Sequence, residues 1–160
     1  MDTIWGNAKR ILGLWGPPQP GEPPRAVYRM GADLDGNPIG CDCSAFVARC
    51  CGQRKKDAEG LWWNTDRIYG DAKKGGDHKR WRQVDAPYPG CIGVYPGKTI
   101  DGTRHAGHVW VVDDPAKRTT IECSSSGKGI AGRRRPAWFK PGATGNGKPI
   151  IWAEFVGEAA

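Results

Sequence analysis

The segment from Asp42 to Gly52 constrains the fold most strongly, because its pattern predicts a short helix with a cysteine in the first turn. Asp42 is a favourable N-cap residue, and Gly52 is favourable just beyond a helix C-terminus. One face of this helix, with the spacing i, i+3, i+4 and i+7, consists of Cys43, Phe46, Val47 and Cys50. Cys43 therefore points inward at the positive end of the helix dipole, which favours thiolate over thiol. A buried cysteine can also serve as a small hydrophobic residue, so a nucleophile needs a base elsewhere in the chain.

Length and composition indicate a single domain. The chain has 160 residues, of which 38% are hydrophobic, and it contains 24 Gly, 13 Pro and eight Trp residues. This composition is typical of a compact, loop-rich fold. We expect residues 1–25 to form an N-terminal amphipathic helix followed by a Pro-rich linker, and residues 26–160 to form one domain.

Charge and cysteine content restrict the environment of the protein. A net charge of +7 favours an anionic partner, such as nucleic acid, a membrane surface or an acidic cell-wall polymer. The longest apolar run, from Ile11 to Gly16, is too short to span a bilayer, and the N-terminus lacks the pattern of a signal peptide. We therefore expect synthesis in the cytoplasm of the producing cell, no membrane span, and reduced thiols at the six cysteines.

The remaining patterns predict helices, loops and strands. Helical spacing of apolar residues occurs in segments 2–15 and 57–74, whereas segment 16–24 is too rich in proline to continue the first helix. Segments 33–40 and 142–147 are expected to form loops. Short apolar runs bounded by Gly and Pro predict strands at 91–95, 108–112, 119–124 and 150–156.

The second and third of these strands are expected to pair as a hairpin. A symmetric pairing about Pro115 places His108 directly opposite Glu122, with both side chains on one face and about 5 Å apart. Glu122 can then accept a hydrogen bond from one imidazole nitrogen and leave the other nitrogen free. A slip of one residue would bring Cys123 to that face instead.

Cys43, His108 and Glu122 together have the composition of a catalytic triad. The histidine takes the thiol proton, the thiolate attacks a carbonyl carbon to form an acyl-enzyme, and the glutamate orients the imidazole. Backbone N–H groups at the start of the helix can stabilise the oxyanion. The sequence therefore predicts a catalytic domain over residues 26–160 with a cysteine nucleophile.

The residues around Cys43 resemble the signature of a known family. The segment Asp42-Cys43-Ser44-Ala45-Phe46-Val47 is similar to the D-C-S-G-hydrophobic motif of the NlpC-type cell-wall cysteine peptidases, which are related to CHAP domains. Further segments that resemble family motifs are Tyr28 to Gly31, Asn64-Thr65, Pro89-Gly90, Gly107-His108-Val109 and Ile121 to Ser124. The chain departs from the family pattern at three positions. Ala45 replaces Gly, Cys91 replaces Asp, and Glu122 stands where His, Asn or Gln is commoner.

The resemblance spans residues 26–130 and implies a papain-like α+β fold, with N-terminal helices packed on a small antiparallel sheet and the nucleophile at a helix N-terminus. It also implies a peptidoglycan hydrolase that uses no metal or other cofactor and cleaves amide bonds of bacterial stem peptides. A bacteriophage lysin or virion-associated hydrolase fits, acting on the wall after release or within a phage particle. Expected substrate contacts are Tyr28, Asp42, Ser44, Trp62 and Trp63.

The sequence also allows two other interpretations. A zinc-binding or redox module would draw on Cys41, Cys43, Cys50, Cys51, His105 and His108. Their spacing fits poorly, because zinc sites usually present pairs of cysteines two to four residues apart on a turn. A basic nucleic-acid-binding protein would use Arg133 to Arg135 with Trp138 and Phe139, although no nucleic-acid-binding motif occurs in the sequence.

Overall fold

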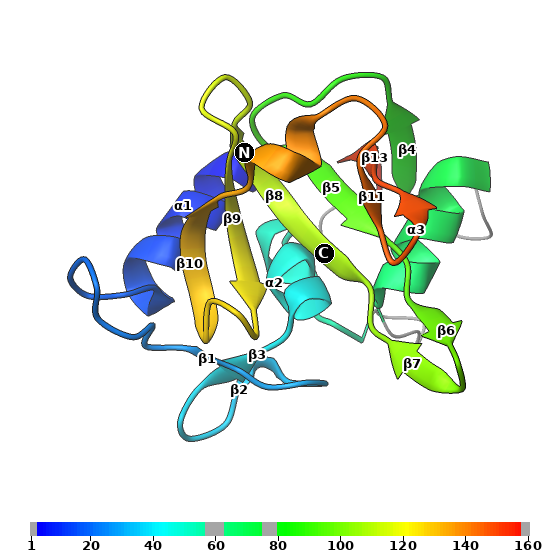
Figure 1. The fold of residues 1–160 in the computed structure, drawn as a ribbon. Coiled ribbons are helices and arrows are strands. Elements are labelled where there is room, and N and C mark those ends of the chain that lie inside the picture. The colour runs from blue at the N-terminus through cyan, green and yellow to red at the C-terminus, as the bar shows by residue number, and fades with distance from the viewer. Residues whose placement is uncertain (1–2, 57–62, 75–79, 158–160) are drawn as a thin grey trace.

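Three α-helices and one large sheet make up the described part of this computed structural model, which covers residues 3–56, 63–74 and 80–157 (Figure 1). The α-helices are α1 (Ile4–Trp15), α2 (Cys43–Cys50) and α3 (Thr65–Lys74), and a short 3₁₀ helix is η1 (Pro136–Phe139). None of the described helices is long and apolar enough to cross a lipid bilayer.

The sheet has nine strands among the described residues, in the spatial order β2-β3-β1-β10-β9-β8-β5-β13-β4. These strands are β1 (Val27–Tyr28), β2 (Asp33–Asp35), β3 (Gly40–Cys41), β4 (Trp81–Val84), β5 (Ile92–Tyr95), β8 (His108–Asp114), β9 (Thr119–Ser124), β10 (Gly129–Arg134) and β13 (Ile151–Phe155). Neighbouring strands are antiparallel except β1 and β3, which are parallel. Two small hairpins pair β6 (Lys98–Ile100) with β7 (Thr103–His105) and β11 (Thr144–Gly145) with β12 (Lys148–Pro149).

The predicted fold class is wrong. We expected a papain-like α+β fold with N-terminal helices on a small antiparallel sheet, but strand residues outnumber helical residues, and the sheet is large and mixed. Within the large sheet, the strands that the sequence pattern missed are β1, β2, β3, β4 and β10. None of them shows a clear alternation of apolar and polar residues, and β10 is mostly glycine and arginine. They form strands because neighbouring strands supply partners for their backbone groups, an effect of tertiary context.

The main core lies between the helices and one face of the sheet. The helix expected over residues 2–15 is confirmed as α1, which begins after Thr3 because the Thr3 hydroxyl accepts a hydrogen bond from the N–H of Gly6. Ala8 and Ile11 of α1 enter the same core as residues of α2, α3 and the sheet. The N-terminal helix is therefore packed into the domain.

The helix predicted from Asp42 to Gly52 is also confirmed. It occurs as α2, packs on β8 and β9, and buries Phe46 and Val47 completely. Gly52 follows it with a φ of 72°, a left-handed conformation that suits glycine after a helix. α2 thus presents its first residue, Cys43, from a rigid and buried element.

The four predicted strands are confirmed as well. Segments 91–95, 108–112, 119–124 and 150–156 contain β5, β8, β9 and β13. The helix expected over residues 57–74 occurs as α3 from Thr65, and residues 57–62 lie outside the described part of the chain. The loop expected at 142–147 includes the short strand β11.

A second, aromatic cluster covers the opposite face of the sheet. Its buried members are Cys91, Trp110 and Val112, and the side chains packed against them are Tyr95, Trp138, Phe139, Ile150 and Trp152. Trp110 stacks on Trp138 of η1, with ring centroids 4.1 Å apart. Because alternate residues of a strand share a face, His108 extends from β8 on the side of this cluster.

This aromatic packing predicts a large effect at Gly93, which lies opposite Trp110 in the sheet. A Cβ atom at Gly93 would lie 2.3 Å from the indole of Trp110, so Gly93→Ala should destabilise the fold by about 1–3 kcal/mol. A Cβ at Gly13 of α1 meets no atom within 4 Å, so Gly13→Ala should stabilise by about 0.5–1 kcal/mol. Thermal melts test both variants, and a Gly93→Ala protein as stable as wild type would contradict this packing.

Candidate active site

Cys43 is the first residue of α2, and Asp42 caps the helix. The Asp42 carboxylate accepts hydrogen bonds from the N–H groups of Ala45 and Gly31, both at 2.9 Å. The bond from Ala45 satisfies a backbone donor of α2 that has no partner within the helix, so the helix starts at the cysteine. Cys43 is 7% exposed, and the dipole of α2 points its positive end at the thiol.

A buried ion pair holds this helix start in place. Nζ of Lys55 lies 2.5 Å from Oδ2 of Asp42 and donates to Oγ of Ser44 at 2.9 Å. Ser44 also donates to the backbone carbonyl of Trp63. Asp42 and Ser44 were expected to contact substrate, but their side chains are buried and are engaged in this network. Lys55 was missed because lysine is normally exposed, and only its tertiary pairing with Asp42 explains its burial.

His108 begins β8 beside β9, but the expected hairpin register is wrong by two residues. Val112 lies opposite Thr120, and continuing that pairing places His108 opposite Ser124 instead of Glu122. Since the side-chain period of a strand is two, this shift leaves Glu122 on the same face as His108. The two side chains are now diagonal neighbours, a spacing that the long glutamate side chain can bridge.

The turn of this hairpin explains the shift. The Asp114 carboxylate accepts hydrogen bonds from the N–H groups of Ala116 and Lys117, at 3.0 and 3.2 Å. Such a bonded aspartate stabilises its own turn. In addition, the register shifts between Val112 and Asp114, where β8 has one extra residue. The turn is therefore centred further along the chain than Pro115.

Glu122 is completely buried and has three polar partners. Its Oε1 lies 3.5 Å from Nε2 of His108, which is longer than a well-formed hydrogen bond. Arg135 pairs with Oε1 through Nη2, and its Nε lies 3.4 Å from Oε2. Thr120 donates to Oε2 at 2.6 Å. Thr120 precedes Glu122 by two residues and so shares its strand face, a signal present in the sequence, whereas Arg135 arrives from another part of the chain.

Cys123, the alternative to Glu122, extends to the other face of β9. It is buried in the main core, and its thiol donates to the backbone carbonyl of Cys41 at 3.1 Å. The structure therefore brings Glu122 next to His108 and places Cys123 beneath α2.

The environment perturbs the pKa values of both His108 and Glu122. Burial lowers the pKa of His108, but interactions with Cys43 and Glu122 outweigh burial and raise it to about 9. Burial raises the pKa of Glu122, but its contacts with His108, Arg135 and Thr120 lower it to about 2. At neutral pH the site therefore favours an imidazolium beside an ionised carboxylate. Because Nε2 faces Glu122, Nδ1 is the nitrogen that can exchange a proton with the thiol.

Four of the cysteines have environments that favour the protonated thiol. All six cysteines are free. Burial raises the pKa of Cys50, Cys51 and Cys91, to about 11 for Cys91. A hydrogen bond with Cys41, followed by burial, raises the pKa of Cys123. Cys43 lies at a helix N-terminus and interacts with His108.

An open pocket of about 300 Å³ lies beside His108. Its lining includes aromatic, hydroxyl and basic side chains: Tyr28, Tyr95, Trp138, Ser124, Ser125, Ser126 and Arg135. Burial, and next the charge of Cys43, raise the pKa of Tyr28 to about 12, so its hydroxyl remains a hydrogen-bond donor at neutral pH. Tyr28 is thus the expected substrate contact that the structure brings to this pocket.

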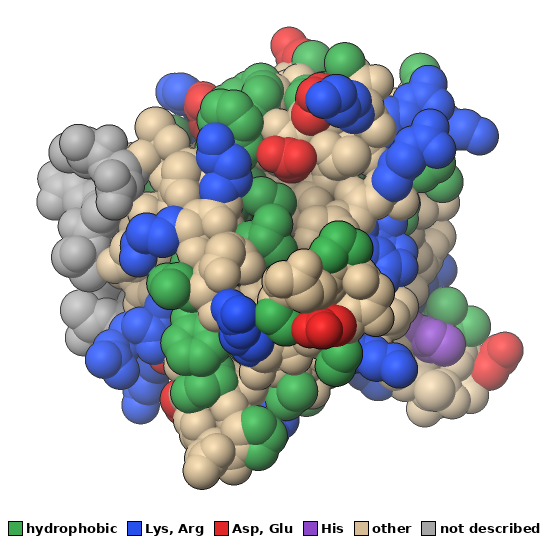
Figure 2. Space-filling view, turned by 90° about the vertical axis from the view of Figure 1, so that its left-hand side faces the viewer, with side chains coloured by type: hydrophobic (Ala, Val, Ile, Leu, Met, Phe, Trp, Pro, Cys, Tyr) green, Lys and Arg blue, Asp and Glu red, His purple; other side chains and the backbone are tan. Residues whose placement is uncertain are grey.

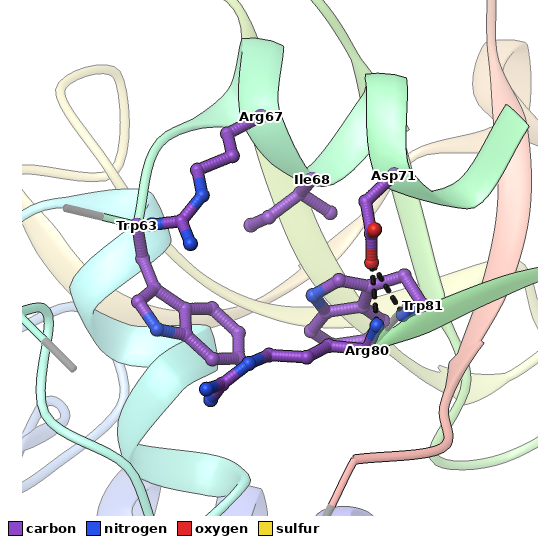
Figure 3. Close-up of a pocket in the computed structure, with 6 residues that line it drawn as sticks. All are labelled: Trp63, Arg67, Ile68, Asp71, Arg80 and Trp81. Atoms are coloured by element: carbon purple, nitrogen blue, oxygen red, sulfur yellow. Dashed lines mark hydrogen bonds between the residues drawn. The ribbon is translucent and has the colours of Figure 1, made fainter. Parts of the chain in front are cut away.

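Trp63 lies elsewhere, in the main core. It is 3% exposed and contacts the edge of Trp81, with ring centroids 5.7 Å apart. Both rings border a cavity of about 20 Å³ between α3 and β4, where the Asp71 carboxylate accepts hydrogen bonds from two backbone N–H groups (Figure 3). That space holds about one water molecule, and its lining shares no residue with the pocket beside His108. Trp62 lies outside the described residues.

Several residues of the two alternative interpretations have other partners in the structure. Among the described residues, no group of three or more His, Cys, Asp or Glu side chains is arranged to hold a metal ion. The three arginines 133–135 do not form one basic surface, because Arg135 pairs with Glu122 whereas Arg134 is exposed. The guanidinium of Arg135 also covers the ring of Trp138, with Cζ 4.5 Å from the ring centroid.

Comparison of the chain with protein-family models, curated proteins and solved structures finds no match. The geometry of the site itself therefore provides the basis for inferring its chemistry.

Proposed function

We propose that this protein is a cysteine-dependent peptidoglycan hydrolase that cleaves amide bonds of bacterial stem peptides through an acyl-enzyme. The observation that carries this proposal is the grouping of Cys43, His108 and Glu122, in which contacts with the thiol and the carboxylate raise the pKa of His108 to about 9. A thiol at a helix start next to such a histidine has the features of an activated nucleophile.

The proposed reaction uses these groups in turn. Nδ1 of His108 holds the proton that the Cys43 thiol has given up, and the thiolate attacks the carbonyl carbon of the scissile amide to form a tetrahedral intermediate. The imidazolium then gives its proton to the leaving amine, and the C–N bond breaks to leave a thioester on Cys43. Water, deprotonated by His108, hydrolyses this thioester, so the carboxylate product leaves and the thiol is restored.

Two groups are suited to stabilise the oxyanion. The N–H of Cys43 is the first of α2, and such N–H groups have no acceptor within their own helix. Tyr28 lines the pocket beside His108, and its hydroxyl remains protonated at neutral pH. Both are donors to negative charge that develops when the thiolate attacks.

The substrate class rests on the resemblance of Asp42 to Val47 to cell-wall peptidase motifs and on charge. The net charge of +7 favours an anionic bacterial wall as partner, and Figure 2 shows Lys and Arg side chains spread over one face of the molecule. A lysin released from its producing cell, or a hydrolase carried on a phage particle, would act on such a wall.

Product analysis tests this function. Purified peptidoglycan is digested with wild type and with Cys43→Ala, each checked for folding by thermal melt, and the fragments are examined by mass spectrometry. We expect new amino and carboxyl termini on stem peptides only with wild type. Cleavage confined to glycan strands, or equal cleavage by both proteins, would contradict the proposal.

A further inference from the structure

Arg135 is held in a fixed position between β10 and η1. Its backbone N–H donates to the carbonyl of Arg118 at 2.9 Å. Its guanidinium covers the ring of Trp138, and Nη2 lies 3.3 Å from Oγ of Ser126. The guanidinium also makes a bidentate pairing with the Glu122 carboxylate. These contacts surround the guanidinium and fix its orientation toward the carboxylate.

One oxygen of Glu122 is shared between two cations. Oε1 pairs with Nη2 of Arg135 and lies 3.5 Å from Nε2 of His108, while Oε2 accepts the hydroxyl of Thr120. The carboxylate is completely buried, and a buried charge without a partner is strongly destabilising. When His108 is neutral, as it must be after donating its proton, Arg135 is the cation that still compensates Glu122.

We propose that Arg135 is a positioning residue, which holds the Glu122 carboxylate ionised throughout the reaction cycle and limits its attraction for the His108 imidazole. The role of Arg135 in a reaction cycle rests on the function proposed above. Arg135 draws Oε1 to itself, so the contact between Glu122 and His108 stays long. The imidazolium is consequently stabilised without being prevented from giving up its proton to a leaving group.

Several ionisable groups face this histidine from the elements packed around it. They are Cys43 of α2, Glu122 of β9, Arg135, and the pocket tyrosines Tyr28 of β1 and Tyr95 of β5. Burial, more than any charge, raises the pKa of both tyrosines, so they stay neutral near pH 7. The charged groups that raise the pKa of His108 are therefore Cys43 and Glu122, and Arg135 pairs with the second of these.

Titration of His108 by NMR tests the proposal without substrate. The protein contains three histidines, and a His108→Gln variant identifies the His108 signal in histidine-labelled protein. Arg135→Gln removes a nearby positive charge and releases Oε1 to the imidazole, so the His108 midpoint should rise by about one pH unit. Arg134→Gln removes an equal charge from an exposed neighbouring position and should leave the midpoint unchanged. An equal midpoint in wild type and folded Arg135→Gln overturns the proposal.

A mutant cycle separates action through Glu122 from a direct effect on His108. In a Glu122→Gln background, adding Arg135→Gln should change the midpoint by much less than it does in wild type. An equal shift in both backgrounds would overturn the proposed route through Glu122. If Arg135→Gln does not fold, Arg135→Lys replaces it, since lysine keeps the positive charge but cannot make the bidentate contact with Glu122. Its midpoint should rise by a smaller amount, and an unchanged midpoint again overturns the proposal.

The rate of Cys43 alkylation by iodoacetamide gives a second measurement. The alkylation rate is measured against pH, and the pH at which it changes as His108 loses its proton should be higher in Arg135→Gln, as the His108 midpoint is. A purely structural role of Arg135 would change only the melting temperature. Neither measurement needs peptidoglycan. Absence of stem-peptide cleavage by wild type would therefore refute the proposed function alone, and an unmoved titration would refute the role of Arg135 alone.

Discussion

Replacing Cys43 with alanine is expected to lower the rate of stem-peptide hydrolysis by about 10³-fold or more while leaving the fold intact. Loss of the nucleophile removes the acyl-enzyme route, and only binding and oxyanion contacts remain to assist direct attack by water. Because alanine is a small helix-favouring residue, the variant should melt close to wild type. The initial rate of release of new amino termini from purified peptidoglycan gives the measurement.

Cys41→Ser is the matched control for this prediction. Cys41 is two residues away and buried, and its thiol donates to the carbonyl of Asp42, a bond that serine can keep. It should retain activity, and Cys43 should be the cysteine that iodoacetamide alkylates fastest near neutral pH. An inactive, folded Cys41→Ser protein together with an active Cys43→Ser protein would show that the nucleophile is assigned to the wrong residue.

Replacing Glu122 with alanine is expected to lower the rate by about 10²- to 10⁴-fold, because His108 loses the group that orients its imidazole. The variant also leaves Arg135 without its buried carboxylate partner, so its stability must be measured alongside its rate. Glu122→Gln should retain more activity, since an amide oxygen still accepts a hydrogen bond from the imidazole.

The pH dependence of these variants follows from the direction of the pKa shifts. The His108 pKa of about 9 means that the imidazolium and its stabilising contacts are lost as the pH rises through that value. Wild-type activity should therefore fall above about pH 9. Glu122→Gln removes the negative charge that helps raise the His108 pKa, so this fall should move to lower pH. Rates measured from pH 5 to 11 in constant ionic strength test the shift.

Cys123→Ala is the control that tests which face of β9 carries the residue that orients His108. Cys123 extends away from His108 into the main core, so its replacement should reduce stability modestly and leave the pH profile unchanged. A Glu122→Ala enzyme with wild-type rates beside a folded but inactive Cys123→Ala enzyme would show that the orienting residue is on the other face of β9.

The sequence by itself determined those features that depend on near neighbours along the chain. Capping by Asp42 and the left-handed conformation of Gly52 define α2, so the position of Cys43 at a helix start could be predicted. The strand containing His108 and the strand containing Glu122 were likewise predictable from short apolar runs. Although the predicted register was wrong by two residues, His108 and Glu122 still share a face, because side chains alternate along a strand with a period of two.

Tertiary structure decided the extent of the sheet. β1, β3 and β10 have too few alternating apolar residues to be recognised locally, and they form strands because neighbouring strands supply backbone partners. The pairing of β1 with β10 joins segments that lie far apart in the sequence. That is why a large mixed sheet appears where a small antiparallel one was expected.

Tertiary structure also decided which polar residues complete the site. Lys55 and Arg135 occur in ordinary basic stretches of the sequence, and neither has a local partner that marks it. Each acquires its role because the fold buries a carboxylate, Asp42 or Glu122, where water cannot solvate it. A buried carboxylate requires a cation, and only the assembled fold determines which cation can reach it.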